Sequence, residues 1–253
     1  MKLTAAQFEK ISPYLPRQRG NVSMSNHQLV NAILYVTENG CKWRALPKEF
    51  GNWHTVYVRM NRWSKNGVLK RLFEALQTEG IIRIRMEAVC MDSTIVKVHP
   101  DGTGVLKKPG KQAIGRSRGG LTTKIHMVTA SDRSAVAFRL SAGNRHDSLE
   151  GEMLLEEMKR PPEAVYLIMD RAYEGERTRA KGVELGYMPV VPPKANRKVA
   201  WVYDKELYKK RNEIERFFLR LKRFRRVFTR YDKLDIMYSG FIYFAMIVDA
   251  LLV

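Results

Sequence analysis

The chain has 253 residues, of which 45 are Lys or Arg and 26 are Asp or Glu, so its formal net charge is +19 at pH 7. Hydrophobic residues make up 45% and aromatic residues 10%, which is enough for a core and excludes an intrinsically disordered chain. The length fits one large domain, or a compact domain with a smaller companion. Solubility needs far less charge, so the excess predicts an anionic partner, with nucleic acid ahead of a membrane surface.

The first 84 residues have the pattern of short helices. A capping residue, Ser25 or Asn26, precedes an apolar periodicity that ends at Gly40. After a turn segment, Asn52 can cap a second helix, and a third amphipathic segment follows it. We therefore expect a small all-helical domain over residues 1–84.

The second of these helices carries two cations, Arg59 and Arg62. Basic side chains on the second helix of such a pair are typical of a helix-turn-helix DNA reader. A plain three-helix bundle is the alternative, with Trp43, Trp53 and Trp63 as its core. The net charge of +19 favours the DNA-binding interpretation.

From residue 85 onward the pattern changes to alternating strands and helices. Strands are predicted over residues 87–100, 121–130, 134–142, 164–170 and 187–191, and helices over 147–159, 176–185 and 204–224. Asp147 and Glu150 have the spacing of a capping box at the first of these helices. The order predicts an α/β fold, a mixed sheet with helices on its faces.

Two features bear on where the protein resides. Residues 234–253 form the longest apolar stretch, but Asp235 and Asp249 lie inside it, so we expect a buried packing helix and no membrane partner, with a tail anchor as the alternative. Cys41 and Cys90 have no metal-binding spacing, and the N-terminus lacks the apolar run of a signal peptide. These features predict a cytoplasmic protein with reduced thiols.

Three carboxylates could carry chemistry. Asp92 lies in the middle of an apolar strand, Asp170 ends the apolar strand YLIMD, and Glu215 lies on the long basic helix. Carboxylate oxygens are the ligands that Mg²⁺ prefers when a metal assists phosphoryl transfer. Each residue alone has a structural alternative, as an edge residue, a helix cap or an ion-pair partner.

The helix over residues 204–224 adds to this set. Tyr208, Arg211, Glu215 and Lys222 are spaced three, four and seven residues apart, so they share one helix face. This face combines a carboxylate with two cations and a phenol, which suits a metal site beside a phosphodiester.

Other basic or aromatic segments have two interpretations each. The run 222–226 is interpreted as a DNA-backbone track rather than a solvated face, through Lys222, Arg223, Arg225 and Arg226. The Gly/Lys/Arg stretch over 101–120 lacks P-loop spacing and is either a DNA-contacting loop or a solvated hairpin extension. Trp201 either packs or stacks on a base.

These segments resemble the DDE transposases of bacterial insertion sequences, families four and five. The closing motif of those families, Tyr-x2-Arg-x3-Glu-x6-Lys, is matched at every spacing from Tyr208 to Lys222. MDST at 91–94 and MDRAYEG at 169–175 resemble the first and second Asp motifs, and GNRHD at 143–147 resembles another block of the family. The N-terminal segment resembles the companion helical domain.

The resemblance implies a fold and a site. The fold is an RNase H-like catalytic domain over residues 85–253, preceded by a helical DNA-binding domain over 1–84. The ligands of two Mg²⁺ ions, for which Mn²⁺ can substitute, are Asp92, Asp170 and Glu215. The residues that act on the phosphate are Lys222, Arg211 and Tyr208.

The resemblance also implies an activity and partners. The protein is expected to bind the terminal inverted repeats of an insertion sequence and to catalyse metal-dependent DNA cleavage and strand transfer. Its partners would be double-stranded DNA, at the element ends and the target, and a second copy of itself in a nucleoid-associated complex. A catalytically inert DNA-binding repressor and a stand-alone metal-dependent nuclease are the alternatives, and the intact acidic triad argues against inertness.

Overall fold

The helical unit is assembled from separate stretches of the chain. The computed structural model describes residues 1–20, 22–84, 86–104, 110, 112–158 and 160–252. It divides into a first unit of Met1–Ile82, Val98–Gln112 and Arg220–Val253, and a second unit of Arg83–Lys97 and Ala113–Leu219. The N-terminal boundary lies close to the predicted residue 84. The C-terminal segment differs from the prediction, since it groups with the helices of the first unit.

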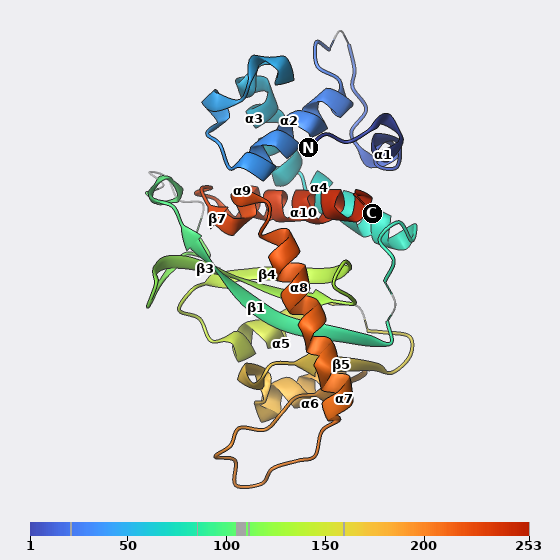
Figure 1. The fold of residues 1–253 in the computed structure, drawn as a ribbon, viewed down its shortest axis with the longest axis vertical. Helices are drawn as coiled ribbons and strands as arrows, with labels where there is room; N and C mark the ends of the chain where they lie inside the picture. Colours follow the sequence, from blue (N-terminus) through green and yellow to red (C-terminus); the bar gives the residue numbers. More distant parts are fainter. Residues whose placement is uncertain (21, 85, 105–109, 111, 159, 253) are drawn as a thin grey trace. The chain divides into compact units, whose positions relative to one another are not determined.

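The first unit consists mainly of helices (Figure 1). The helices are α1 (Ala5–Glu9), α2 (Asn26–Asn39), α3 (Trp53–Lys65), α4 (Val68–Thr78), α9 (Arg225–Phe228) and α10 (Asp235–Leu251), with 3-10 turns at Ser12–Tyr14, Trp43–Ala45, Lys48–Phe50 and Pro100–Gly102 and the short strand β7 (Thr229–Arg230). Ser25 and Gln28 form a capping box at the start of α2, and Gly40 ends this helix with φ 63°. The side chain of Asn52 caps α3, as predicted.

The connection between α2 and α3 differs from the short turn that the sequence suggested. It contains two 3-10 turns, so it is longer than the three or four residues of a standard helix-turn-helix. Trp63 is buried, whereas Trp43 and Trp53 are half-buried. The three tryptophans therefore do not form one common core, and two of them contribute to the surface.

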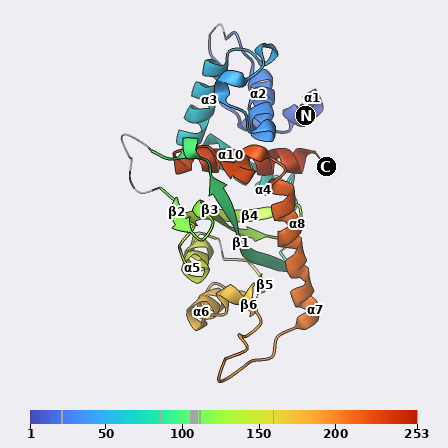
Figure 2. The ribbon, with the colours of Figure 1, turned by 60° about the vertical axis from the view of Figure 1, so that its left-hand side comes forward.

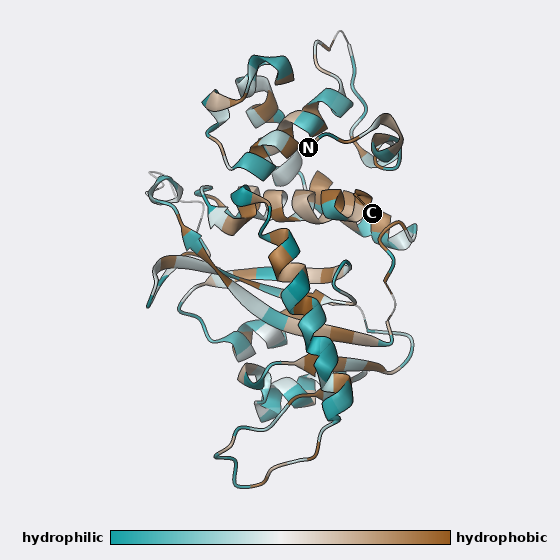
Figure 3. Ribbon diagram, viewed as in Figure 1, coloured by the Kyte–Doolittle hydropathy of each residue, from teal (hydrophilic) through white to brown (hydrophobic). Residues whose placement is uncertain are grey.

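The C-terminal helix α10 is the buried packing helix that the sequence predicted. Helices α2, α3 and α4 pack against it, and its ribbon is mostly apolar in Figure 3. A Cβ atom at Gly240 would lie 2.2 Å from the Ser64 Oγ, so this close contact with α3 requires glycine. Asp249 forms an ion pair with Arg220 at 2.9 Å. Within the described residues, no helix combines the length and the apolar character needed to cross a membrane.

The second unit is built on a mixed sheet. Its strands are β1 (Ala88–Val98, whose last residue groups with the first unit), β2 (Gly115–Ser117), β3 (Gly120–Thr129), β4 (Ala135–Ala142), β5 (Val165–Met169) and β6 (Tyr187–Val190). The order is β2-β3-β1-β5-β6, with β4 paired to β3. Strands β3 and β4 run antiparallel in a meander with β1, whereas β5 and β6 run parallel to it. This mixed sheet, with flanking helices and a preceding helical region, confirms the predicted α/β fold class.

Helices cover both faces of this sheet (Figure 2). The helices are α5 (Asp147–Glu157), α6 (Glu176–Glu184), α7 (Lys205–Tyr208) and α8 (Asn212–Leu221), with 3-10 turns at Arg171–Tyr173 and Lys209–Arg211. On one face, Val89 and Met91 of β1 share a buried cluster with Leu154 of α5. Side chains alternate along a strand, so Cys90 points to the other face, where its thiol donates to the Lys210 carbonyl at 3.3 Å. Cys41 and Cys90 are both free thiols.

Two helix starts and ends differ from the prediction. The helix expected over 204–224 tightens into a 3-10 turn at Lys209–Arg211 and ends at Leu221, before Lys222. Helix α5 begins at Asp147, but His146 is its N-cap and no side chain caps it. The predicted capping box is therefore not formed, because the Asp147 carboxylate bonds to the sheet instead.

Candidate active site

Asp92 lies on β1, and Asp170 directly follows the adjacent parallel strand β5. Met91 of β1 is in register with Met169 of β5, and Asp92 and Asp170 are the residues that directly follow them in the sequence. Neighbouring strands lie about 4.8 Å apart, and residues in register project to the same face. Strand β5 ends at Met169, and Asp170 then occupies the N-cap position of the following 3-10 turn, with no capping hydrogen bond from its side chain. The fold thus brings together two carboxylates that are 78 residues apart in the sequence.

Arg211 joins the third carboxylate to this pair. Its Nη1 atom lies 3.0 Å from the Asp92 Oδ2, and its Nη2 atom lies 2.5 Å from the Glu215 Oε1. The side chain of Asp92 is 17% exposed, that of Arg211 23% and that of Glu215 48%. One guanidinium therefore bridges a carboxylate of the sheet and a carboxylate of α8 at a partly exposed position.

The electrostatics of Asp92 reflect this crowding. Burial raises its pKa to about 6, and the negative charges of Asp170 and Glu215 also raise it. The Ser93 N–H, which donates to the Asp92 Oδ1 at 2.7 Å, and the Arg211 charge act in the opposite direction. Three carboxyl groups, those of Asp92, Asp170 and Glu215, thus lie near one cation, Arg211.

Tyr208 lies at the edge of the same site. Burial raises its pKa, the Arg211 charge lowers it, and the Asp170 charge raises it. Its ring meets the Tyr203 ring edge-on at 5.5 Å. Five of the residues predicted to carry the chemistry therefore lie in one place in the second unit: Asp92, Asp170, Tyr208, Arg211 and Glu215.

The basic residues after α8 do not form a single surface track. Lys222 lies in the turn after α8 and groups with the first unit, so its role beside the carboxylates stays a prediction. Arg223 and Arg225 are exposed. Arg226 differs from the prediction, because it is 5% exposed, pairs with Asp232 at 3.0 Å and donates to the Cys41 carbonyl.

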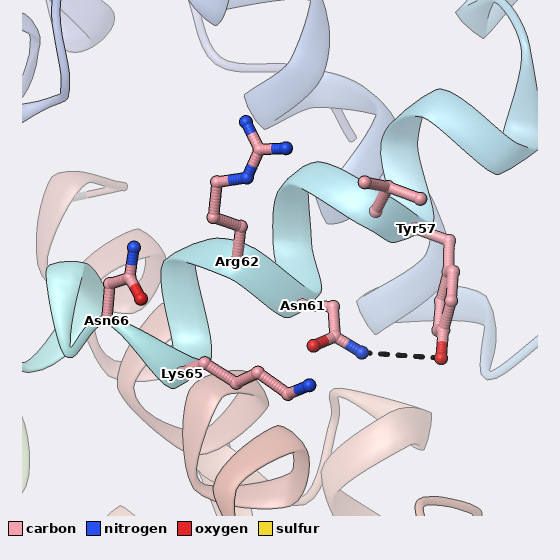
Figure 4. A pocket seen from close by; sticks show the side chains of 6 residues that line it. Tyr57, Asn61, Arg62, Lys65 and Asn66 are labelled. Atoms are coloured by element: carbon pink, nitrogen blue, oxygen red, sulfur yellow. Dashed lines mark hydrogen bonds between the residues drawn. The ribbon is translucent and has the colours of Figure 1, made fainter.

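The two arginines of α3 that were predicted to contact DNA have different surroundings. Arg59 donates to the Met24 carbonyl at 2.9 Å and to the Asn26 Oδ1 at 2.5 Å, so it links α3 to the start of α2. Arg62 is exposed and lines a shallow pocket of about 350 Å³ (Figure 4). The other residues around this pocket are Tyr57, Val58, Asn61, Lys65 and Asn66. Sequence reasoning missed them, although Tyr57, Asn61 and Lys65 recur at the four-residue spacing of one helix face.

Trp201 packs against its own unit. Its indole N–H donates to the Val191 carbonyl at 2.9 Å, and the Arg179 guanidinium lies 3.6 Å from the ring centroid. The ring face is thus already covered. Of the 101–120 stretch, residues 105–109 and 111 lie outside the described part of the chain.

The donor set suits a hard divalent cation. In the described part of the chain, no three His, Cys, Asp or Glu side chains are grouped as a metal-binding cluster. Yet the Arg211 guanidinium already serves Asp92 and Glu215 as a shared cation, and carboxylate oxygens are the donors that Mg²⁺ and Mn²⁺ take. These residues fit a metal ion provided that Arg211 releases Asp92.

Comparisons with known proteins identify the family of the chain. A family described as "Putative transposase of IS4/5 family" matches residues 3–73, and the "Transposase DDE domain" matches residues 83–201. A protein of insertion element IS402 from Burkholderia cepacia is 35% identical over 98 residues, which cover 34% of this chain and 67% of that protein. The "Putative transposase for insertion sequence element IS6501" of Brucella ovis is 29% identical over 126 residues, covering 49% of this chain and 95% of that protein. The chain belongs to the insertion-sequence family of DDE transposases.

Two solved transposase structures show a weak similarity to the chain. The piggyBac transposase in a synaptic complex with hairpin DNA aligns with a TM-score of 0.40 and 11% identity, over 77% of this chain and 50% of that one. The Mos1 mariner paired-end complex with Mn aligns with a TM-score of 0.34 and 12% identity, over 93% of this chain and 82% of that one. The chain thus spans half the length of the piggyBac protein, and at these scores we base no argument about the site on either structure.

Proposed function

We propose that the chain cuts and joins DNA at the ends of an insertion sequence. The observation that carries the proposal is the convergence of Asp92, Asp170 and Glu215: the two aspartates directly follow a pair of residues in register on parallel strands, and Glu215 is held to Asp92 through Arg211. Divalent metal ions bound by these carboxylates would activate the attacking hydroxyl and stabilise the leaving oxygen. Mg²⁺ is the proposed ion, with Mn²⁺ as a substitute.

The protein residues around the carboxylates have separate roles in this proposal. With metal held by the carboxylates, Arg211 would leave Asp92, and its guanidinium would bind the scissile phosphate, because arginine presents a planar fork to phosphate oxygens. Tyr208 hydrogen-bonds near the same phosphate. Lys222 is proposed as a further phosphate contact from the end of the closing motif.

Strand transfer with a labelled duplex of the terminal repeat tests the chemistry. We expect Asp92→Asn, Asp170→Asn and Glu215→Gln each to reduce cleavage and joining by at least about a thousandfold, since each removes a metal ligand. Glu213→Gln is the matched control, because Glu213 lies two residues from Glu215 on α8 and points away from it. Wild-type activity in any of the three variants would overturn the site assignment. Cleavage without joining would favour the nuclease alternative, and DNA binding without cleavage the repressor.

A surface of α3 is the proposed DNA contact. Besides the pocket lined by Arg62 and Lys65, a second shallow pocket of about 340 Å³ is lined by Lys42, Trp43, Arg44, Trp53 and Tyr57. Tyr57 lines both pockets, and residues 40–73 contain a single acidic residue, Glu49. Basic side chains with interleaved aromatic and amide groups suit contacts to phosphates and base edges.

The salt dependence of DNA binding tests this surface. We expect Arg62→Ala and Lys65→Ala each to lower the slope of log affinity against log salt by about 1, as expected for the loss of one phosphate contact. Lys70→Ala is the control, because Lys70 is outside both pockets and lies 3.8 Å from Glu74. Equal slopes for the wild type and the Arg62 and Lys65 variants would contradict the assignment. The proposal also includes a dimer that holds the paired element ends at the nucleoid. Sedimentation of the protein with and without DNA measures whether this dimer forms.

A further inference from the structure

A polar cluster lies on the α5 face of the sheet, behind the strand that carries Asp92. We call it the Asp147 cluster, and it consists of Ser93, Lys124, His126, Asp147 and Tyr173. The Asp147 Oδ1 accepts from the Lys124 Nζ at 2.9 Å and from the Ser93 Oγ at 3.1 Å. The side chains of Lys124 and Asp147 are 12% and 24% exposed, so this pair is largely shielded from water.

The cluster is connected to Asp92 through one residue. Ser93 is the neighbour of Asp92 on β1, and successive side chains of a strand point to opposite faces. The Ser93 hydroxyl therefore bonds to Asp147 on the α5 face, while the Ser93 N–H donates to the Asp92 Oδ1 at 2.7 Å. Asp147 thus constrains the residue whose backbone orients the first metal-ligand carboxylate.

Two further buried groups face Asp147. The His126 side chain is fully buried; its Nε2 lies 2.7 Å from the Ser141 Oγ and its Nδ1 lies 3.9 Å from the Asp147 Oδ1. Tyr173 is fully buried, and its ring fills the space beside Gly151, where a Cβ atom would lie 2.7 Å from the Tyr173 Cε1. Tyr173 is the last residue of the 3-10 turn whose N-cap is Asp170, so the second Asp motif packs beside the Asp147 cluster through Tyr173.

Helix α5 offers an internal comparison. Asp147 and Glu150 are both acidic residues of its first turn. Glu150 bonds to Arg139 at 3.0 Å and to Arg145 at 2.9 Å, and neither arginine lies on β1. Asp147 is the one of the two that contacts the strand carrying Asp92. A helix-dipole role would treat both acids alike, whereas a link to β1 distinguishes them.

We propose that Asp147 is a positioning residue for the metal site: by holding the Ser93 hydroxyl from behind the sheet, it keeps the Ser93 N–H on one oxygen of Asp92 and leaves the other oxygen for the cation. This inference rests on the proposed function, because it takes Asp92 as a metal ligand. The contact becomes important when Arg211 leaves Asp92, since the Ser93 N–H then holds the carboxylate in its orientation. Groups that orient metal ligands in this way typically contribute tenfold to a hundredfold in metal affinity.

Calorimetric titration of the full chain with Mn²⁺ alone, without DNA, tests the inference. We expect Asp147→Asn and Ser93→Ala each to weaken Mn²⁺ binding by about tenfold. Ser93→Thr keeps the hydroxyl and should bind like the wild type. Glu150→Gln is the matched control, expected to lower the thermal midpoint by removing two ion pairs while Mn²⁺ affinity stays within about twofold of the wild type.

Asp92→Asn separates failure of this inference from failure of the proposed function. If Asp92→Asn binds Mn²⁺ like the wild type, the metal site itself is wrongly assigned. If Asp92→Asn loses binding while Asp147→Asn and Ser93→Ala keep it, the positioning role alone is overturned. Should Asp147→Asn fail to fold, the comparison of Ser93→Ala with Ser93→Thr decides, because both keep the Asp147–Lys124 ion pair.

Discussion

The Arg211 Nη1 lies 3.0 Å from the Asp92 Oδ2, so the guanidinium occupies the side of the carboxylate that faces α8. The same guanidinium reaches Glu215 one helical turn further on. Burial disfavours the Arg211 charge, but Asp92, Glu215 and the neighbouring Asp170 together raise its pKa. The cation thus holds together acidic groups that would otherwise repel each other.

Removing this cation should destabilise the metal-free protein and increase its response to metal. In chelator, we expect Arg211→Ala to lower the free energy of unfolding by about 1–3 kcal/mol, because Asp92 is left partly buried without its partner. Added Mn²⁺ should raise the thermal midpoint of the variant more than that of the wild type. Arg216→Ala, at an exposed position of α8, is the control. An equal response to Mn²⁺ in wild type and Arg211→Ala would show that Arg211 does not compete with the ion.

Asp92 should make stability depend on pH. Its pKa in the folded state is about 6, above the ordinary value of 3.8, so ionisation disfavours the fold at neutral pH. In chelator near pH 8, Asp92→Asn should therefore raise the free energy of unfolding by about 1–3 kcal/mol. As the pH falls through about 6 towards 4, the wild-type carboxyl becomes protonated and this gain should disappear. Urea unfolding across this range measures the gain, and a gain that grows on acidification would contradict the assignment.

The contact between α3 and α10 should tolerate no side chain at Gly240. Its Cβ would lie 2.2 Å from the Ser64 Oγ and 3.1 Å from the Ser64 Cβ. Gly240→Ala should cost about 1–3 kcal/mol by overpacking, despite the better helix propensity of alanine. Adding Ser64→Ala removes the clashing oxygen and should restore part of the loss. Additive effects in this double-mutant cycle would show that the two residues do not meet.

The neighbours Arg225 and Arg226 should behave differently. Arg226 is buried on Asp232, so Arg226→Ala should cost about 3–5 kcal/mol by leaving a buried charge unpaired. Arg225 is exposed, so Arg225→Ala should change stability by at most about 0.5 kcal/mol while weakening DNA binding. Chemical unfolding and DNA titration of the two variants measure both effects. The reverse order of stabilities would contradict the burial of Arg226.

Local sequence signals were sufficient for several ends of helices and strands and for part of the candidate site. Ser25, Gly40 and Asn52 act on the backbone within a few residues, so the ends of α2 and the start of α3 could be predicted. The closing-motif spacing placed Arg211 and Glu215 on neighbouring helical turns, where they form an ion pair. The position of Asp170 after an apolar strand indicated its place at a strand end.

The tertiary structure decided which partner each charged side chain has. Arg226 and Arg225 are neighbours in one basic run, yet burial on Asp232 separates them, and Arg59 is held by the start of α2 while Arg62 stays exposed. Asp147 has the spacing of a helix cap, but its carboxylate accepts hydrogen bonds from Ser93 and Lys124, which lie on strands distant in the sequence. The net charge of +19 and the residue spacings are properties of the sequence alone. Burial and long-range pairing exist only after folding, because they depend on which segments, far apart in the chain, meet in space.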